Sequence, residues 1–114
     1  MKTIAIVGSR DYPNLAAVAD FVRRLPKDTC VVSGGARGVD KVAEEHARAC
    51  GLQVKVFPAK WAVEGRAAGF NRNIEIVKAS DIVMAFWDGK SKGTAHTIRL
   101  AKQLGKELYI EHSR

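Results

Sequence analysis

Basic side chains follow the ends of several short apolar runs, and glycines stand beside most of them. The cations of interest are Arg10, Arg37, Arg72, Lys90 and Lys92. A guanidinium group binds phosphate through two parallel hydrogen bonds, and an ammonium group attracts it as a point charge. If the apolar runs are parallel strands, these cations gather at one edge of the sheet, where open α/β sheets bind their ligands. The pattern predicts a site for a polyanionic ligand.

Residues 33–40 carry the strongest anion-binding pattern in the chain. They read Ser-Gly-Gly-Ala-Arg-Gly-Val-Asp and join a predicted strand to a predicted helix. Free backbone N–H groups and the helix dipole attract anions at such a turn. We therefore predict phosphate binding by Ser33, Gly34, Gly35, Ala36, Arg37 and Gly38. Ordinary NAD binding is disfavoured, because a dinucleotide fingerprint needs an acid after the next strand, where the chain has Phe57-Pro58-Ala59-Lys60.

Two more segments contribute candidate ligand-binding residues. Gly8-Ser9-Arg10 combines a tight turn, a hydroxyl and a guanidinium; the alternative is a surface turn in which Asp11 or Asn14 caps a helix. A third helix is expected to open near Asn71-Arg72-Asn73. The asparagines there suit helix capping, and a cation at a helix start opposes the dipole, which suggests an anion nearby.

Residues 87–94 provide a second helix start suited to anions. Gly93 and Thr94 open the predicted helix. Gly89-Lys90-Ser91 is similar to the tail of a Walker A loop, but the glycine required earlier would fall at Met84 inside a strand, so we reject a P-loop. Trp87 either stacks on a base or sugar, or seals the sheet edge.

Asp40 and Asp88 are the candidate catalytic carboxylates. Each follows a predicted strand, where it could act as a general acid or base or bind a ribose hydroxyl. Asp40 has a structural alternative, since an acid in the first turn of a helix stabilises the helix dipole. The three histidines lack metal-ligand spacing, and we expect neither a metal nor a cofactor.

The elements that must position these residues alternate between strand and helix patterns. Short apolar runs predict five strands, at residues 4–7, 30–32, 54–57, 82–86 and 108–110. Apolar residues at three- and four-residue steps predict helices near 15–25, 39–50, 70–77 and 95–104, with Gly51 and Gly105 at C-cap positions. Residues 58–69 are expected to form an irregular loop. We therefore predict one α/β domain over residues 1–114, three-layered and Rossmann-like, with a mainly parallel sheet of about five strands.

Composition and charge fit this domain and favour an anionic partner. The chain has 114 residues, 46% of them hydrophobic and 27% charged, which excludes disordered and collagen-like classes. A net charge of +7 suits a nucleotide or a nucleic acid. Cys30 and Cys50 form no disulfide framework, and the first apolar run is too short for a signal peptide or a membrane span. We expect a cytoplasmic protein without a membrane partner.

Together, these segments resemble the SLOG superfamily, named for the DNA-processing protein DprA/Smf and the LOG enzymes, and within it the YspA-like (cpYpsA-related) branch. The resemblance rests on Gly8-Ser9-Arg10, Ser33 through Asp40, Ala68 through Asn73, and Phe86-Trp87-Asp88-Gly89 with Gly93-Thr94. It implies a Rossmannoid domain that binds a nucleotide or nucleotide-derived ligand, such as a nucleoside monophosphate or ADP-ribose, as a homo-oligomer. LOG enzymes carry a catalytic glutamate in a PGGxGTxxE motif; here Gly93-Thr94 match and Thr97 stands at the glutamate position.

Three functions stay open at this point. The first is a sensor or processing domain that binds such a ligand, with Arg10 and Arg72 on the phosphate and Trp87 or Trp61 over the base. The second is hydrolysis of the N-glycosidic bond of nucleotides, with Asp40 or Asp88 in place of the glutamate. The third is DprA-like binding of single-stranded nucleic acid along the basic edge, which a steep salt dependence would reveal.

Overall fold

A five-stranded parallel sheet forms the middle of the computed structural model, which describes residues 2–113. The strands are β1 (Thr3–Gly8), β2 (Cys30–Ser33), β3 (Gln53–Val56), β4 (Ile82–Trp87) and β5 (Glu107–His112). Their order across the sheet is β3-β2-β1-β4-β5, and all four neighbouring pairs are parallel. The prediction of a parallel sheet of about five strands is confirmed.

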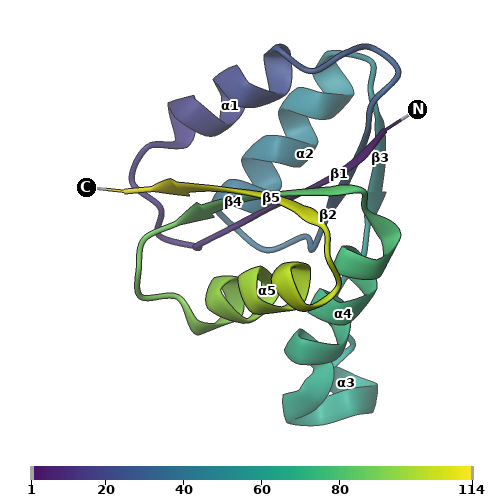
Figure 1. Ribbon diagram of the computed structural model, residues 1–114, viewed down its shortest axis with the longest axis vertical. Helices are drawn as coiled ribbons and strands as arrows, with labels where there is room; N and C mark the ends of the chain where they lie inside the picture. The colour runs from purple at the N-terminus through teal and green to yellow at the C-terminus, as the bar shows by residue number, and fades with distance from the viewer. Residues whose placement is uncertain (1, 114) are drawn as a thin grey trace.

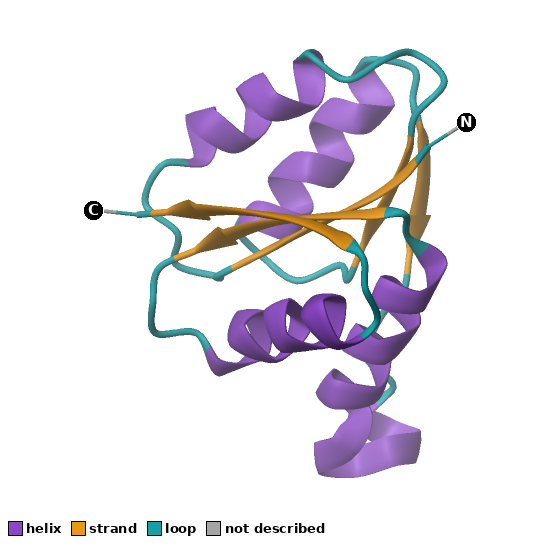
Figure 2. Ribbon diagram, in the orientation of Figure 1, coloured by secondary structure: helices purple, strands orange, loops and turns teal. Residues whose placement is uncertain are grey.

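Helices cover both faces of this sheet (Figure 1, Figure 2). α1 (Leu15–Arg23) and α2 (Val39–Ala49) lie on one face. α4 (Ala68–Ala79) and α5 (Lys92–Gln103) lie on the other face. The short α3 (Trp61–Glu64) lies beside the end of α4 that is remote from the sheet. The three predicted layers are therefore present. The helices within residues 2–113 are each too short or too polar to span a membrane.

Two apolar clusters hold the layers together, one on each face of the sheet. Successive side chains of a strand point to opposite faces, so Ile4 and Ile6 of β1 pack under α1 and α2, while Ala5 and Val7 pack under α4 and α5. β1 and β4 are buried on both faces, as continuous apolar runs predict. β3 and β5 are the edge strands, and their residues are all exposed or half-buried.

The helix ends follow the predicted caps at the first, second and last helices. The side chain of Asn14 accepts a hydrogen bond from the Ala17 amide and caps α1. Gly51 and Gly105 follow α2 and α5 with φ of 77° and 68°, a left-handed conformation that glycine adopts at little cost. These two positions end their helices as expected.

The prediction of an irregular loop over residues 58–69 is wrong. This stretch contains α3, the 3₁₀ turn η1 (Gly65–Ala67) and the start of α4. Its alanines and Glu64 favour helix, and Gly65, with φ of 58°, only breaks the helical path in two. Because α4 begins earlier than expected, Asn71 and Asn73 cap nothing, and Arg72 lies in the second turn rather than at the helix start.

The topology places a crevice between β1 and β4. After β1 the chain continues to β2 and β3 on one side, and after β4 it continues to β5 on the other. The connections that leave these two neighbouring strands therefore diverge, and open α/β folds bind ligands at such a point.

Candidate functional site

A small cavity, here called the inner pocket, lies at the carboxyl ends of β1 and β4. Its volume is about 70 Å³. The residues lining it are Val7, Gly8, Arg10, Ala36, Asp40, Arg72, Asn73, Ile76, Ser91, Gly93, Thr94 and Thr97. They come from the end of β1 and the loop after it, the loop after β4, the turn before α2 and its first residues, and helices α4 and α5. The cavity thus opens at the predicted edge of the sheet.

Arg72 is anchored in this pocket by two hydrogen bonds. Its Nη1 donates to the Gly34 carbonyl at 2.7 Å, and its Nε donates to Asn73 Oδ1 at 3.1 Å. A side chain at position 34 would prevent the first contact, because a Cβ built on Gly34 lies 2.4 Å from Arg72 Nη1. These two bonds use two of the five guanidinium N–H groups, so the side chain keeps donors for a ligand.

Arg72 lies near one carboxylate, that of Asp40, and near one other cation, Arg10. Burial lowers the pKa of the guanidinium, Asp40 opposes this shift, and the nearby cation Arg10 adds to it. Arg10 also lines the inner pocket, with an exposed side chain. Two like charges are therefore held close together at the rim, and their repulsion falls when an anion binds between them.

Asn73 connects Arg72 to α5. Its side-chain oxygen accepts from Arg72, and its amide nitrogen lies 3.3 Å from the Gly93 carbonyl and 3.2 Å from His96 Nδ1. Donation to His96 Nδ1 requires the tautomer with its proton on Nε2. Asn73 is buried, so it positions the guanidinium from inside the protein. The sequence pattern indicates helix capping for Asn73 and gives no sign of this positioning role.

Asp40 lies at the floor of the pocket with only 6% of its surface exposed. One carboxylate oxygen accepts a hydrogen bond from the Ala36 amide at 3.2 Å. Burial is the largest influence on this group and raises the pKa of Asp40 to about 6; the Ala36 amide and Arg72 oppose that shift, and Glu44 adds to it. A carboxyl group that titrates near neutral pH is suited to acid–base work.

Glu44 is a second buried carboxylate behind the pocket, and the sequence reasoning missed it. It is 2% exposed and accepts a hydrogen bond of 2.7 Å from the Ser33 hydroxyl. The spacing gave a signal, since Glu44 follows Asp40 by four residues on the buried stripe with Ala43 and Ala47. Ser33 is therefore occupied internally, and its hydroxyl does not point into the inner pocket.

The start of α5 closes the other side of the pocket. Ser91 caps this helix, because its side chain accepts from the Thr94 amide, and it also bonds the Thr94 hydroxyl at 3.1 Å. Thr97 donates to the Gly93 carbonyl at 3.1 Å, so its hydroxyl is satisfied within the helix. The positive end of the α5 dipole therefore lines the same cavity as the two arginines.

Asp88 organises the loop before α5 and does not line the pocket. Its carboxylate accepts from the amides of Lys90 and Ser91 at 2.8 and 2.9 Å, and these bonds lower its pKa. The Asp88 amide donates to the buried Ser9 hydroxyl at 3.1 Å, which ties the loop to the end of β1. Both side chains are thus engaged in contacts that shape this loop, and neither lines the inner pocket.

Three further predicted ligand-binding side chains lie away from the inner pocket. Arg37 is 70% exposed and pairs with Asp11 at 3.3 Å. Trp87 donates to the Ser91 carbonyl at 3.0 Å and packs beside His112, so it covers the core at the sheet edge. Asn71 is half-buried on α4 and outside the pocket.

Gly34, Gly35 and Ala36 line a neighbouring cleft of about 240 Å³, which Arg10, Arg72 and Trp61 also line; Ala36, Arg10 and Arg72 line the inner pocket as well. Gly38 acts through its backbone: its φ is 78°, and a Cβ built there would lie 2.4 Å from the Arg10 carbonyl. The two loops that carry Arg10 and the glycine-rich turn therefore cross at close range. Only glycine fits this crossing.

An outer hollow of about 330 Å³ continues from the inner pocket and shares Arg10, Arg72, Asn73, Ser91 and Gly93 with it. Arg66 and Lys92 add two more cations, and carboxylates are absent among the described residues that line it. Trp61 and Phe70 also line it, 55% and 51% exposed. Cations beside exposed aromatic rings match the chemistry of a nucleotide.

The chain is similar in sequence to a described family and to a phage protein. A family model described as YspA, cpYpsA-related SLOG family matches residues 2–63. The chain is 39% identical over 115 residues to the Gene 61 protein of Mycobacterium phage D29, and the alignment covers 92% of each protein.

Two solved structures are similar in fold. DNA processing protein A from Helicobacter pylori, described with a single-stranded DNA binding mode, matches with a TM-score of 0.79, 24% identity and coverage of 96% of this chain. DNA processing protein A from Streptococcus pneumoniae matches with a TM-score of 0.84, 18% identity and the same coverage. This chain spans 64% and 50% of the length of those two solved chains.

Proposed function

The chain belongs to the YspA, cpYpsA-related SLOG family, and on that premise we propose that it binds a nucleotide or nucleotide-derived ligand through its phosphate. One observation carries the proposal: Arg10, Arg72 and the N-terminus of α5 line the same pocket. An anion between these groups reduces the repulsion of the two guanidinium groups and gains the attraction of the helix dipole.

The inner pocket and the outer hollow differ in volume, so each suits a different part of the ligand. The inner pocket, at about 70 Å³, suits a compact group such as a phosphate. The outer hollow, at about 330 Å³, falls in the range of small-ligand sites and accommodates a sugar and a base. Trp61 supplies an exposed ring on which the base stacks.

Isothermal titration against nucleoside monophosphates and ADP-ribose tests this function. Removing Arg10 deletes a charge-assisted hydrogen bond, so Arg10→Ala weakens binding by roughly tenfold or more. Arg37→Ala is the matched control, since it removes an exposed arginine outside the pocket, and it leaves the affinity unchanged. Absence of binding by the unaltered protein, or equal losses in both variants, would refute the proposal.

Hydrolysis of the N-glycosidic bond is a second candidate, supported by the buried carboxyl of Asp40 in the pocket and its pKa of about 6. Cleavage of such a bond passes through an oxocarbenium-like state that a nearby carboxylate stabilises. Release of free base from nucleoside monophosphates, lost in Asp40→Asn, is the expected observation. Turnover that survives this substitution would exclude Asp40 from the chemistry.

Single-stranded nucleic acid is the third candidate. It is supported by the fold shared with DNA processing protein A, whose Helicobacter pylori member is described with a single-stranded DNA binding mode. The net charge of +7 favours the same partner. Homo-oligomer formation and a cytoplasmic location stay predictions.

A further inference from the structure

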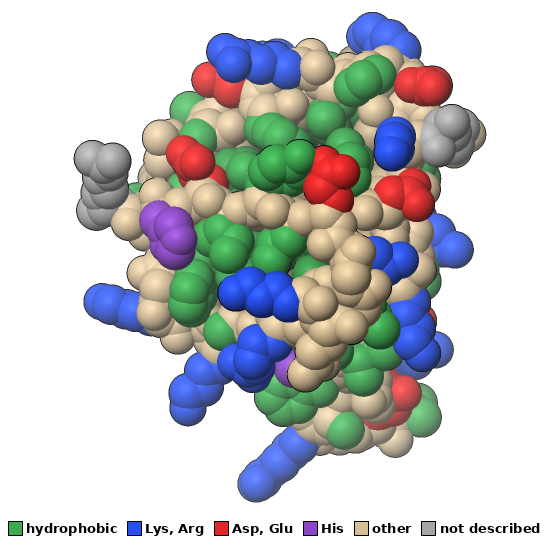
Figure 3. Space-filling view, in the orientation of Figure 1, with side chains coloured by type: hydrophobic (Ala, Val, Ile, Leu, Met, Phe, Trp, Pro, Cys, Tyr) green, Lys and Arg blue, Asp and Glu red, His purple; other side chains and the backbone are tan. Residues whose placement is uncertain are grey.

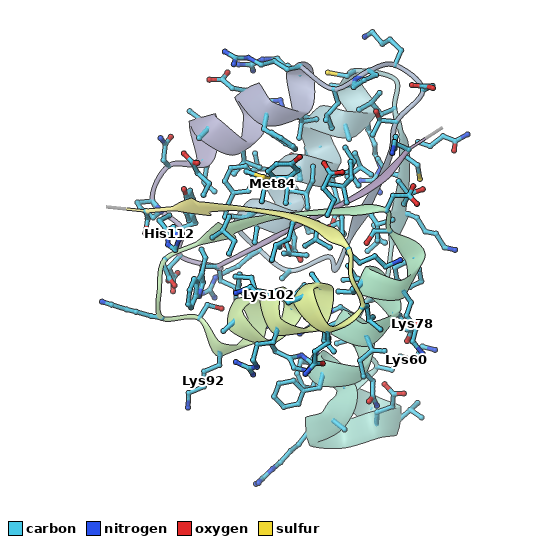
Figure 4. The ribbon with its side chains drawn as sticks, in the orientation of Figure 1. Lys60, Lys78, Met84, Lys92, Lys102 and His112 are labelled. Atoms are coloured by element: carbon cyan, nitrogen blue, oxygen red, sulfur yellow. The ribbon has the colours of Figure 1, made fainter. Side chains whose placement is uncertain are left out.

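The solvent-facing side of α5 is basic along its whole length. The helix sequence, KGTAHTIRLAKQ, contains no acidic residue, and Lys92, Arg99 and Lys102 are exposed. Lys92 and Arg99 are seven residues apart, which places them on one face of the helix. Figure 3 shows the blue side chains gathered over α5 without red ones among them, and Figure 4 shows Lys92 and Lys102 extending from this helix.

These cations lack acidic partners among residues 2–113. The ion pairs of the described residues join Arg23 to Asp20, Arg37 to Asp11 and Lys41 to Glu44, all in the part of the chain that precedes β3. Lys92 moreover stands in the first turn of α5, where the helix dipole disfavours a cation. A run of unpaired positive charge that begins against the dipole fits an extended anion.

Aromatic rings lie between the cations of this surface. The Phe70 ring packs edge-on against His96 with 4.5 Å between centroids. His96 lies on α5, four residues after Lys92 and three before Arg99, so these rings occupy the helix face between the two charges. Lys92 also lines the outer hollow, which makes the surface of α5 continuous with the candidate site.

We infer that the ligand of this site is a single-stranded nucleic acid, whose strand leaves the pocket and runs along α5 over Lys92, Phe70, Arg99 and Lys102. The inference rests on the proposed function, because the inner pocket must first bind one phosphate. A cationic track with exposed rings binds a strand without strong sequence preference: the phosphates contact the cations and a base stacks on Phe70.

Binding of the four deoxynucleoside 5′-monophosphates and of a short oligothymidylate tests the inference. The oligothymidylate binds the unaltered protein at least about tenfold more tightly than any mononucleotide, because it contacts additional phosphates. The double variant Arg99→Ala/Lys102→Ala loses most of this gain and keeps its mononucleotide affinity. The slope of log K against log salt falls by about 1.4 for the two lost contacts.

The double variant Arg24→Ala/Arg48→Ala is the matched control, since it removes two exposed arginines from the α1 and α2 side of the molecule. It leaves the oligothymidylate affinity and the salt slope close to those of the unaltered protein. An equal loss in both double variants would overturn the track along α5 and leave only a general charge effect.

These measurements distinguish failure of the proposed function from failure of the strand along α5. If no mononucleotide binds, the proposed function fails. If mononucleotides bind and the oligothymidylate binds no more tightly, the strand along α5 is refuted and the proposed function stands. If the α5 variant loses affinity for anionic phosphatidylserine vesicles but not for the oligothymidylate, the basic face serves a membrane surface and the inference is refuted.

Discussion

Replacing Asp40 by asparagine should stabilise the protein at neutral pH. Asp40 is buried, and burial raises its pKa from 3.8 to about 6. The folded protein therefore holds a proton that the unfolded chain releases, and its stability falls as the pH rises from below 3.8 through about 6. A pKa unit corresponds to about 1.4 kcal/mol, so the carboxylate costs about 3 kcal/mol once both states are ionised. The neutral asparagine side chain removes this cost and keeps an oxygen for the Ala36 amide.

Urea unfolding at two pH values measures the effect. Between about pH 4.5 and about pH 7.5, the free energy of unfolding of Asp40→Asn rises relative to the unaltered protein by about 2 kcal/mol. Asp20→Asn, at an exposed carboxylate paired with Arg23, is the control and shows little change in this difference. A difference for Asp40→Asn that stays constant with pH, or that shrinks as the pH rises, would refute the assignment of Asp40 as a destabilising buried acid.

Three further substitutions test how the pocket is built. Gly34→Ala places a Cβ 2.4 Å from the Arg72 guanidinium; we expect displacement of this group and a loss of nucleotide affinity of roughly tenfold, measured by calorimetry. Asn73→Ala leaves the Arg72 Nε without its acceptor and removes one of the donors to the Gly93 carbonyl, and urea unfolding should show a loss of about 1–3 kcal/mol. Gly38→Ala combines strain with a backbone clash and should cost more than about 2 kcal/mol, whereas Gly89→Ala, with a φ of 80° and open space around it, should cost only about 1 kcal/mol; equal losses in thermal unfolding would contradict this.

The strands and most helices could be predicted because each carries its own local pattern. β1 and β4 are continuous apolar runs, and α2 repeats its small apolar residues at helical spacing. α3 could not be predicted, because a helix of four residues is too short to show a helical repeat of apolar residues. Gly65, which follows it, is also typical of a loop. The helical form of α3 depends on contacts with η1 and α4 that a single sequence does not display.

The site was predictable only in outline. The placement of Arg10 at this edge follows from the strand order, since it comes directly after β1, whereas Arg72 lies in the second turn of α4 and reaches the edge through the packing of that helix. The role of Asn73 depends on α4 facing α5, and the role of Glu44 depends on α2 packing against the end of β2; the sequence specifies neither contact. For Arg37 the sequence predicts a ligand contact that the structure does not show. A cation in a glycine-rich turn can also point to solvent and pair with a neighbouring acid, as Arg37 does with Asp11.

The crossing between Gly38 and Arg10 affects how this pocket can change over evolutionary time. The contact uses the carbonyl of Arg10 and not its side chain. Any residue at position 10 supplies the same carbonyl, so the guanidinium can be exchanged for another group while the two loops stay in register. Position 10 therefore offers a route to new ligand preferences without loss of the scaffold, and position 38 does not.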